Sequence, residues 1–171
     1  MSRLALMTFG ILREAHGHPA VQGFHDQGKD VFATVDVTDG LIDRCRYAAE
    51  GDPFGAFVTG RLATPELADR VAQTLSLWTN LENVYAFSYA AEHADALRRR
   101  KDWFLKGIWP AYVAWWVADG RWPQWRDANA RLEHLHDHGA TAFAFDFRSP
   151  YAADGRPVTL ERTRIATLRG R

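Results

Sequence analysis

Cysteine is nearly absent from this chain: Cys45 is the only one among 171 residues. A single cysteine excludes an intramolecular disulfide framework and a metal site built from several cysteines. It also fits a protein of a reducing compartment, so we expect a cytoplasmic location. We interpret Cys45 as a small buried side chain rather than a nucleophile.

Net charge and long apolar runs are missing too. The chain carries 21 Lys and Arg against 21 Asp and Glu, so its formal net charge is zero. Without an overall field, attraction to nucleic acid or anionic lipid is weak, and we expect neither as a partner. No apolar stretch approaches the roughly 20 residues that span a bilayer. A glycine-rich phosphate loop and a G-x-S-x-G elbow are also absent, which argues against a built-in nucleotide site and a serine-hydrolase site.

Tryptophan, by contrast, is abundant. The chain has seven, and all but Trp78 lie between Trp103 and Trp125. So much rigid apolar area in one region serves a core, an interface or a pocket.

Apolar periodicity and turn residues predict a regular succession of elements. We expect strands at 3–9, 41–48, 73–80, 110–117 and 142–147, and helices at 19–37, 81–104 and 123–138. Residues 49–64 are rich in Gly and Pro and predict a loop, followed by a helical turn within 64–71. Gly139 is placed to end the last helix.

This order, β-α-β twice and then an α-β appendix, predicts the α+β class: a ferredoxin-like antiparallel sheet with helices on one face. The other face would be bare, and a second copy of the chain is the usual cover. We therefore expect a dimeric α+β barrel around a cavity. Residues 1–148 form one domain, and 149–171 a C-terminal tail, interpreted as irregular or with a strand near 158–165.

Three stretches between residues 87 and 148 resemble a known family: "FSYAAEHADALRRRKDWF", "PAYVAWWVADGRWP" and "RLEHLHDHGATAFAFDFR". They are similar to an uncharacterised bacterial domain family of the dimeric α+β barrel superfamily, which includes antibiotic-biosynthesis monooxygenases and haem-degrading monooxygenases. Before residue 72 the similarity is carried mainly by Phe24, Gly40 and Arg44. The resemblance implies a homodimer and leaves the cofactor open between none and haem.

The resemblance also assigns a role to one histidine. In related haem-degrading barrels a histidine on the corresponding helix ligates iron, so His93 would be the ligand if haem is bound. Two positions depart from the family pattern: Asp43 stands where a tryptophan is expected, and Phe32 where an asparagine is expected.

The helix predicted at 81–104 carries a polar stripe. Tyr85, Tyr89 and His93 are four residues apart and share one face. A neutral histidine in such a stripe is a competent base near pH 7. A structural histidine bonded to a tyrosine is the alternative that stays open.

Asp43 is the second candidate base. It lies on an otherwise apolar strand face, where burial would raise the pKa of its carboxyl. Pairing with Arg44 or Arg46 at a strand edge is the equally weighted alternative.

The expected site therefore has His93, Tyr89 and Asp43 as catalytic candidates. The side chains expected to bind the substrate are Tyr85, Trp78, Trp103, Phe104, Trp116, Arg44 and Phe32. His134 and His138 have a spacing that can chelate a divalent ion, but an obvious third ligand is missing, so we expect no metal site.

We expect a small dimeric barrel enzyme that acts on a hydrophobic aromatic or polyketide-like metabolite, foremost as a monooxygenase-type oxidoreductase of secondary metabolism. In the barrels it resembles, a deprotonated electron-rich substrate itself reacts with dioxygen, so that a base and a dry pocket suffice. Three other hypotheses stay open: a haem-dependent enzyme of oxidative or dehydratase chemistry, a cyclase or isomerase, and a non-catalytic ligand-binding protein.

Overall fold

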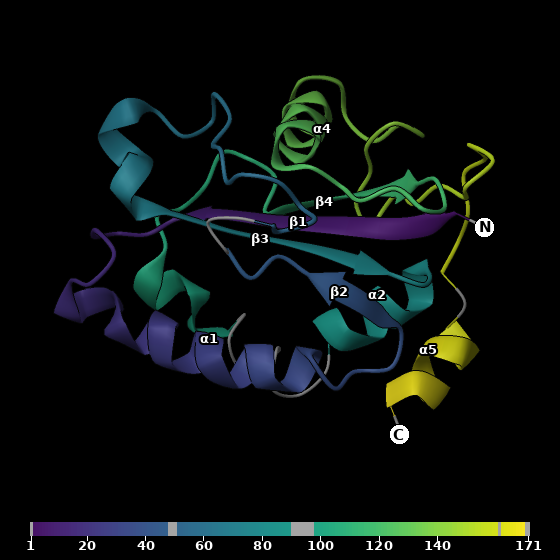
Figure 1. Ribbon diagram of the computed structural model, residues 1–171, viewed down its shortest axis with the longest axis horizontal. Coiled ribbons are helices and arrows are strands. Elements are labelled where there is room, and N and C mark those ends of the chain that lie inside the picture. The colour runs from purple at the N-terminus through teal and green to yellow at the C-terminus, as the bar shows by residue number, and fades with distance from the viewer. Residues whose placement is uncertain (1, 48–50, 90–97, 161, 170–171) are drawn as a thin grey trace.

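A four-stranded sheet lies between two layers of helices in the computed structural model (Figure 1). The structure describes residues 2–47, 51–89, 98–160 and 162–169. One side of the sheet carries α1 (Gln22–Val35), α2 (Leu81–Ser88) and α5 (Arg162–Arg169), together with a short helical segment at 98–103. On the other side lies α4 (Trp125–His138). The chain is thus an α+β protein with helices on both faces of one antiparallel sheet.

The sheet has the order β2-β3-β1-β4. Its strands are β1 (Arg3–Ile11), β2 (Leu41–Arg44), β3 (Val71–Trp78) and β4 (Tyr112–Val117). The central strand, β1, pairs antiparallel with β3 on one side and with β4 on the other. In chain order β1, α1, β2, β3, α2 and β4 follow the βαββαβ succession of the ferredoxin-like fold, as the sequence predicts.

Successive side chains of β1 and β4 point alternately to the two faces of the sheet, and both faces are covered. In β4, Val113, Trp115 and Val117 belong to the core under α4, whereas Ala114 belongs to the core on the side of α1 and α2. The predicted division of this strand into two faces is confirmed. Trp115 is only 2% exposed, so it is a core residue.

The expectation of a bare sheet face is wrong, because α4 covers that face within the same chain. Its buried positions Trp125, Ala128, Leu132 and Leu135 recur at helical spacing and join the strand side chains in one core. Phe54 and Leu62, from the loop before β3, complete the cover. The argument for a second copy over this face, and with it the structural reason for a dimeric barrel, therefore fails.

Several predicted elements have different bounds or a different form. The strand expected at 142–147 is a single bridge between Ala114 and Phe145, and the strand expected near 158–165 overlaps helix α5, which contacts α2. The helix expected at 81–104 is helical at 81–88 and 98–103; residues 90–97 lie outside the described part of the chain. The turn at 64–71 is confirmed as the 3-10 helix η2 (Pro65–Arg70).

A bulge in β2 explains why the side chains of residues 43–45 point to other faces than the sequence pattern predicts. Leu41 pairs with Trp78, but the next pair is Asp43 with Leu77, so the register shifts between them. One extra residue in a strand reverses the faces of the residues that follow it. Arg44 therefore shares the face of Ser76, on the side of α1, and Cys45 is buried in the core under α4.

We predict that α4 carries much of the stability, because it covers a whole sheet face. Leu132→Ala removes a side chain that is 1% exposed and should lower the free energy of unfolding by about 2 to 5 kcal/mol. Arg126→Ala, at an exposed position of the same helix, should change it by less than about 0.5 kcal/mol. Urea unfolding followed by tryptophan fluorescence measures both, and equal effects would contradict the packing of α4 on the sheet.

Candidate functional site: a pocket between helix α1 and the sheet

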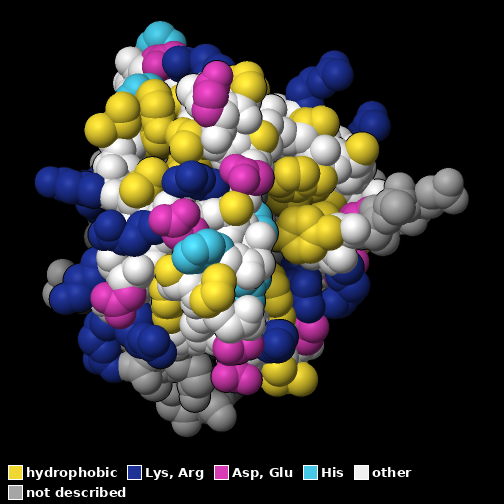
Figure 2. Space-filling model, turned by 90° about the vertical axis from the view of Figure 1, so that its left-hand side faces the viewer, with side chains coloured by type: hydrophobic (Ala, Val, Ile, Leu, Met, Phe, Trp, Pro, Cys, Tyr) yellow, Lys and Arg dark blue, Asp and Glu magenta, His cyan; other side chains and the backbone are white. Residues whose placement is uncertain are grey.

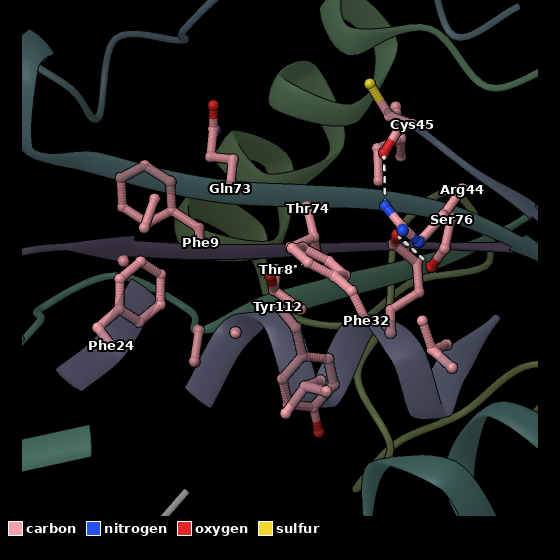
Figure 3. A pocket seen from close by; sticks show the side chains of 18 of the residues that line it. Thr8, Phe9, Phe24, Phe32, Arg44, Cys45, Gln73, Thr74, Ser76 and Tyr112 are labelled. Atoms are coloured by element: carbon pink, nitrogen blue, oxygen red, sulfur yellow. Dashed lines mark hydrogen bonds between the residues drawn. The ribbon is translucent and has the colours of Figure 1, made fainter. Parts of the chain in front are cut away.

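A pocket of about 670 Å³ opens between α1 and the sheet and extends to side chains of the other sheet face, among them Phe9 and Cys45. Its floor is the face of β1, β3 and β4 that looks toward α1, and its roof is α1 itself. The C-terminal end of α2 and the 98–104 segment contribute further walls. Figure 3 shows Phe24 and Tyr112 on the α1 side of the strands, whereas Phe9 points to the opposite side. The volume lies in the ordinary range of small-molecule sites, roughly 300 to 1,000 Å³.

Small side chains on both walls leave this space open. On the floor, Thr8 pairs with Thr74, and the neighbouring pair is Ala72 with Gly10, on which the Phe104 ring packs. In the roof, a Cβ added to Gly28 would meet no atom within 4 Å. Small residues thus line both the roof and the floor of the pocket, where a closely packed core would place large ones.

The two ends of α1 are anchored, in contrast to its middle. Near its N-terminus, Phe24 packs with Val21 and Trp103; at its C-terminus, Val35 joins a core with Trp78 and other side chains. Val35 is the only described residue of α1 that is buried. Helix α1 therefore crosses the pocket and packs on the rest of the protein mainly at its two ends.

Two glycines let the 98–104 segment close one end of the pocket. A Cβ on Gly10 would lie 2.5 Å from the Phe104 ring, and one on Gly23 would lie 3.1 Å from Trp103 Nε1. Both rings thus pack directly on backbone, and Arg100 and Arg99 stack over them. This close packing fixes Trp103 and Phe104 in the wall of the pocket.

Polar groups on the floor form a short row. Thr8 lies between Thr74 and Tyr112 in the strand register, and the Oγ1 atoms of the two threonines are 2.7 Å apart. Since one hydroxyl hydrogen serves that bond, the second remains for another acceptor. Tyr112 accepts a hydrogen bond from Phe147 N–H, and burial raises the pKa of Tyr112 to about 12, so its phenol is neutral at pH 7.

Arg44 lines the pocket with its charge already balanced. Its Nε and Nη2 atoms donate to the two carboxylate oxygens of Asp36 at 2.7 and 2.9 Å, and its guanidinium lies 4.3 Å from the centre of the Phe32 ring. Nη1 donates to the Cys45 carbonyl. We interpret Arg44 as a rigid polar wall rather than a free clamp for an anion.

Six of the predicted site residues meet at this pocket. They are Tyr89, Trp78, Trp103, Phe104, Arg44 and Phe32. They come from α1, β2, β3 and the segment that follows α2, which are far apart in sequence.

The other predicted residues lie elsewhere. Asp43 is at the edge of the sheet, where its Oδ1 accepts from Arg44 N–H and lies 3.5 Å from Arg46 Nη2; this is the structural alternative considered above. Tyr85 lines a second hollow of about 530 Å³ against the C-terminal segment. Trp116 donates from Nε1 to the Tyr151 carbonyl outside the first pocket. His93 lies outside the described residues.

The sequence analysis missed several residues that line the pocket. Thr8, Thr74 and Gly28 carry no recognisable motif, and His25 was not considered. His25 lies beside Phe24 on the face of α1 that repeats at 24, 28, 31 and 35. That helical spacing was a usable signal for its position, but not for its role.

A metal centre has no support in the described residues, which contain no group of three or more His, Cys, Asp and Glu able to hold an ion. His134 is instead bonded to Thr141 Oγ1 at 2.9 Å. Within the same residues, no helix has the length and apolar character needed to cross a membrane. Figure 2 shows positive and negative side chains intermixed over one end of the molecule.

A family model described as "Domain of unknown function (DUF3291)" matches residues 3–161. The chain belongs to this family. No curated protein matches it. The resemblance to an uncharacterised domain family is thus confirmed in its coarse form. The pocket described above lies within the part of the chain that the DUF3291 model matches.

We predict a pH-dependent contribution from the Asp36–Arg44 pair. The hydrogen bonds from Arg44 lower the pKa of Asp36, so the pair stabilises the fold above the unfolded-state pKa of about 4 and ceases to do so as the pH falls through the lower folded-state pKa. Asp36→Asn should cost at most about 1 kcal/mol near pH 7, because the pair is near the surface.

The difference between wild type and Asp36→Asn should vanish at the acid end of a series of urea titrations between pH 7 and pH 2. Asp39→Asn serves as a control, because the described part of the chain shows no ion pair for this exposed carboxylate. A difference that grew toward low pH would contradict the assignment.

Proposed function

We propose that this protein binds a flat, largely apolar metabolite, and acts on it, in the pocket between α1 and the sheet. The observation that carries the proposal is the pocket itself: about 670 Å³ of space, lined mainly by apolar and aromatic side chains, with a few convergent polar groups. This is the usual composition of small-molecule sites.

The shape and chemistry of the walls favour an aromatic ligand with one oxygen function. Phe24, Phe32 and Trp103 present ring faces and edges to the space. The Thr8–Thr74 pair offers one hydroxyl hydrogen from the floor, which suits a carbonyl or phenolic oxygen. The charge of Arg44 is balanced by Asp36, so Arg44 does not by itself favour an anionic ligand.

Oxidation by dioxygen is the reaction that we propose for such a ligand, on the strength of the resemblance to barrel monooxygenases. An activated CH₂ group that becomes a carbonyl consumes one dioxygen and releases one water, so neither flavin nor metal is needed for the balance. The protein has to bind the ligand, exclude water and remove a proton.

Haem and non-catalytic binding are the competing hypotheses. His93, the axial ligand that the resemblance implies if haem is bound, lies outside the described residues, and the proposal uses no haem. Non-catalytic binding shares the pocket with the proposal and differs only in the absence of turnover.

Filling the pocket from its roof tests the binding proposal. Gly28→Phe adds a ring where the structure has open space, and glycine is the poorer helix former, so the helix should not be weakened. We expect the neutral dye N-phenyl-1-naphthylamine, whose fluorescence rises in apolar surroundings, to bind the wild type and to lose at least tenfold in affinity with Gly28→Phe.

Ala33→Phe is the matched control, since it adds the same ring at an exposed position of α1. It should leave dye affinity unchanged. Undiminished binding to a folded Gly28→Phe variant would show that the dye, and by extension a ligand of this class, does not use the pocket.

Isotope labelling tests the reaction. With anthrone, a flat ketone bearing an activated CH₂ group, and ¹⁸O₂, the wild type should form a product that carries one labelled oxygen, and Gly28→Phe should reduce its rate of formation. A protein that binds the dye but yields no labelled product above the protein-free rate would favour non-catalytic binding.

A further inference from the structure

Two histidines lie together at the rim of the pocket. His16 comes from the loop after β1 and His25 from α1, and both line the pocket. His16 Nδ1 and His25 Nε2 are 3.3 Å apart, and the ring centres are 5.1 Å apart.

A backbone carbonyl fixes which nitrogen carries each proton. His16 Nε2 lies 2.7 Å from the carbonyl oxygen of Val71, which can only accept, so His16 is protonated at Nε2. In neutral His16, Nδ1 is then an acceptor, and the bond between the rings requires His25 to donate from Nε2. His25 Nδ1 is left with its lone pair, for which the described residues show no partner.

The surroundings of His25 keep it neutral. Burial, followed by His16, lowers the pKa of His25; Lys29 acts in the same direction, and only Asp26 opposes them. Asp26 itself is engaged by Gln22 at 2.9 Å and by Lys29 at 3.3 Å. The Phe24 ring packs edge-on against His25. A histidine in this state can accept a proton at neutral pH.

We propose that His25 is the general base of the pocket, with His16 as the residue that positions it. The inference rests on the proposed function, because it requires a ligand in the pocket. It specifies the ligand class further: a cyclic ketone or related carbon acid, with a C–H made acidic by a carbonyl that is adjacent to it or conjugated with it through a ring.

The step is a proton transfer without net oxidation. His25 Nδ1 forms an N–H bond as the C–H bond breaks, and the electron pair of that bond passes into the ligand to give an enolate. The free hydroxyl hydrogen of the Thr8–Thr74 pair is available to the enolate oxygen. Return of a proton from the imidazolium restores the ligand.

Hydrogen–deuterium exchange detects this step directly. The probe is 2-tetralone, a flat neutral ketone, incubated without oxygen in D₂O with the full chain and followed by proton NMR at C1. We expect the wild type to accelerate exchange above buffer and above an equal concentration of free imidazole. The rate should rise with pH and level off after a midpoint below the ordinary histidine value of about 6.5.

Three variants separate the roles. His25→Gln keeps a donor toward His16 but cannot act as the base, so exchange at saturating ketone should fall by about tenfold or more in a variant that still binds the dye. His16→Gln removes the neighbour that lowers the pKa of His25 and should move the midpoint upward. His138→Gln, at an exposed position of α4, should change neither.

Dye binding distinguishes the failure of this inference from that of the proposed function. A wild type that binds N-phenyl-1-naphthylamine but gives no acceleration, or a His25→Gln variant that keeps the full rate, overturns the base assignment and leaves the binding proposal intact. A wild type that does not bind the dye overturns the proposed function, and the base assignment falls with it.

Discussion

Helix α1 is held over the sheet at its two ends, and everything proposed for this protein depends on the gap beneath its middle. Trp103 and Phe24 fix one end, and Val35 fixes the other against the core of Trp78. Between these anchors the floor includes Ala72 and the Thr8–Thr74 pair. A protein interior normally closes such a space to organic-crystal density, because the atoms that line a void have no dispersion partners across it. An open gap of this size between two apolar walls is therefore a feature that function explains better than stability does.

The other face of the sheet explains how the chain can sustain that gap. There α4 packs Trp125, Leu132 and neighbouring side chains on the strands in a closely filled core. One well-packed face stabilises the sheet, so the opposite face can be left partly open. The α4 face of the sheet thus provides stability, and the α1 face provides the ligand site. Both faces are covered by helices of the same chain, so a second copy is not needed to cover a bare face.

Periodicity in the sequence predicted the four strands of the sheet and helix α4. Alternation in 110–117 and helical spacing in 123–138 each reflect a face that is covered by other side chains. Periodicity was not sufficient for the side-chain directions in β2, where one extra residue turned Arg44 toward α1 and left Asp43 at an edge beside Arg46. A bulge has no compositional mark in "LIDRCR". The stretch "AFAFDF" likewise gives no sign that only Phe145 would form a β-bridge with the sheet.

The aromatic part of the site was accessible from the sequence for a related reason. Large aromatic side chains usually lie in a core or in the wall of a pocket. This holds for Trp78, Trp103, Phe104 and Phe32, which all line the pocket. Thr8, Thr74 and Gly28 matter because they are small, and a small residue is informative only once its opposite wall is known. His16 and His25 belong together through the loop between β1 and α1, a pairing that spacing alone does not reveal.

Xenon tests the central claim most directly, because the gas occupies apolar space and needs no chemical match. In a crystal of this protein under xenon pressure, the account predicts bound xenon between α1 and the Thr8–Thr74 pair, beside Gly28. A helix α1 packed down onto those threonines, with no xenon beneath it, would contradict the account.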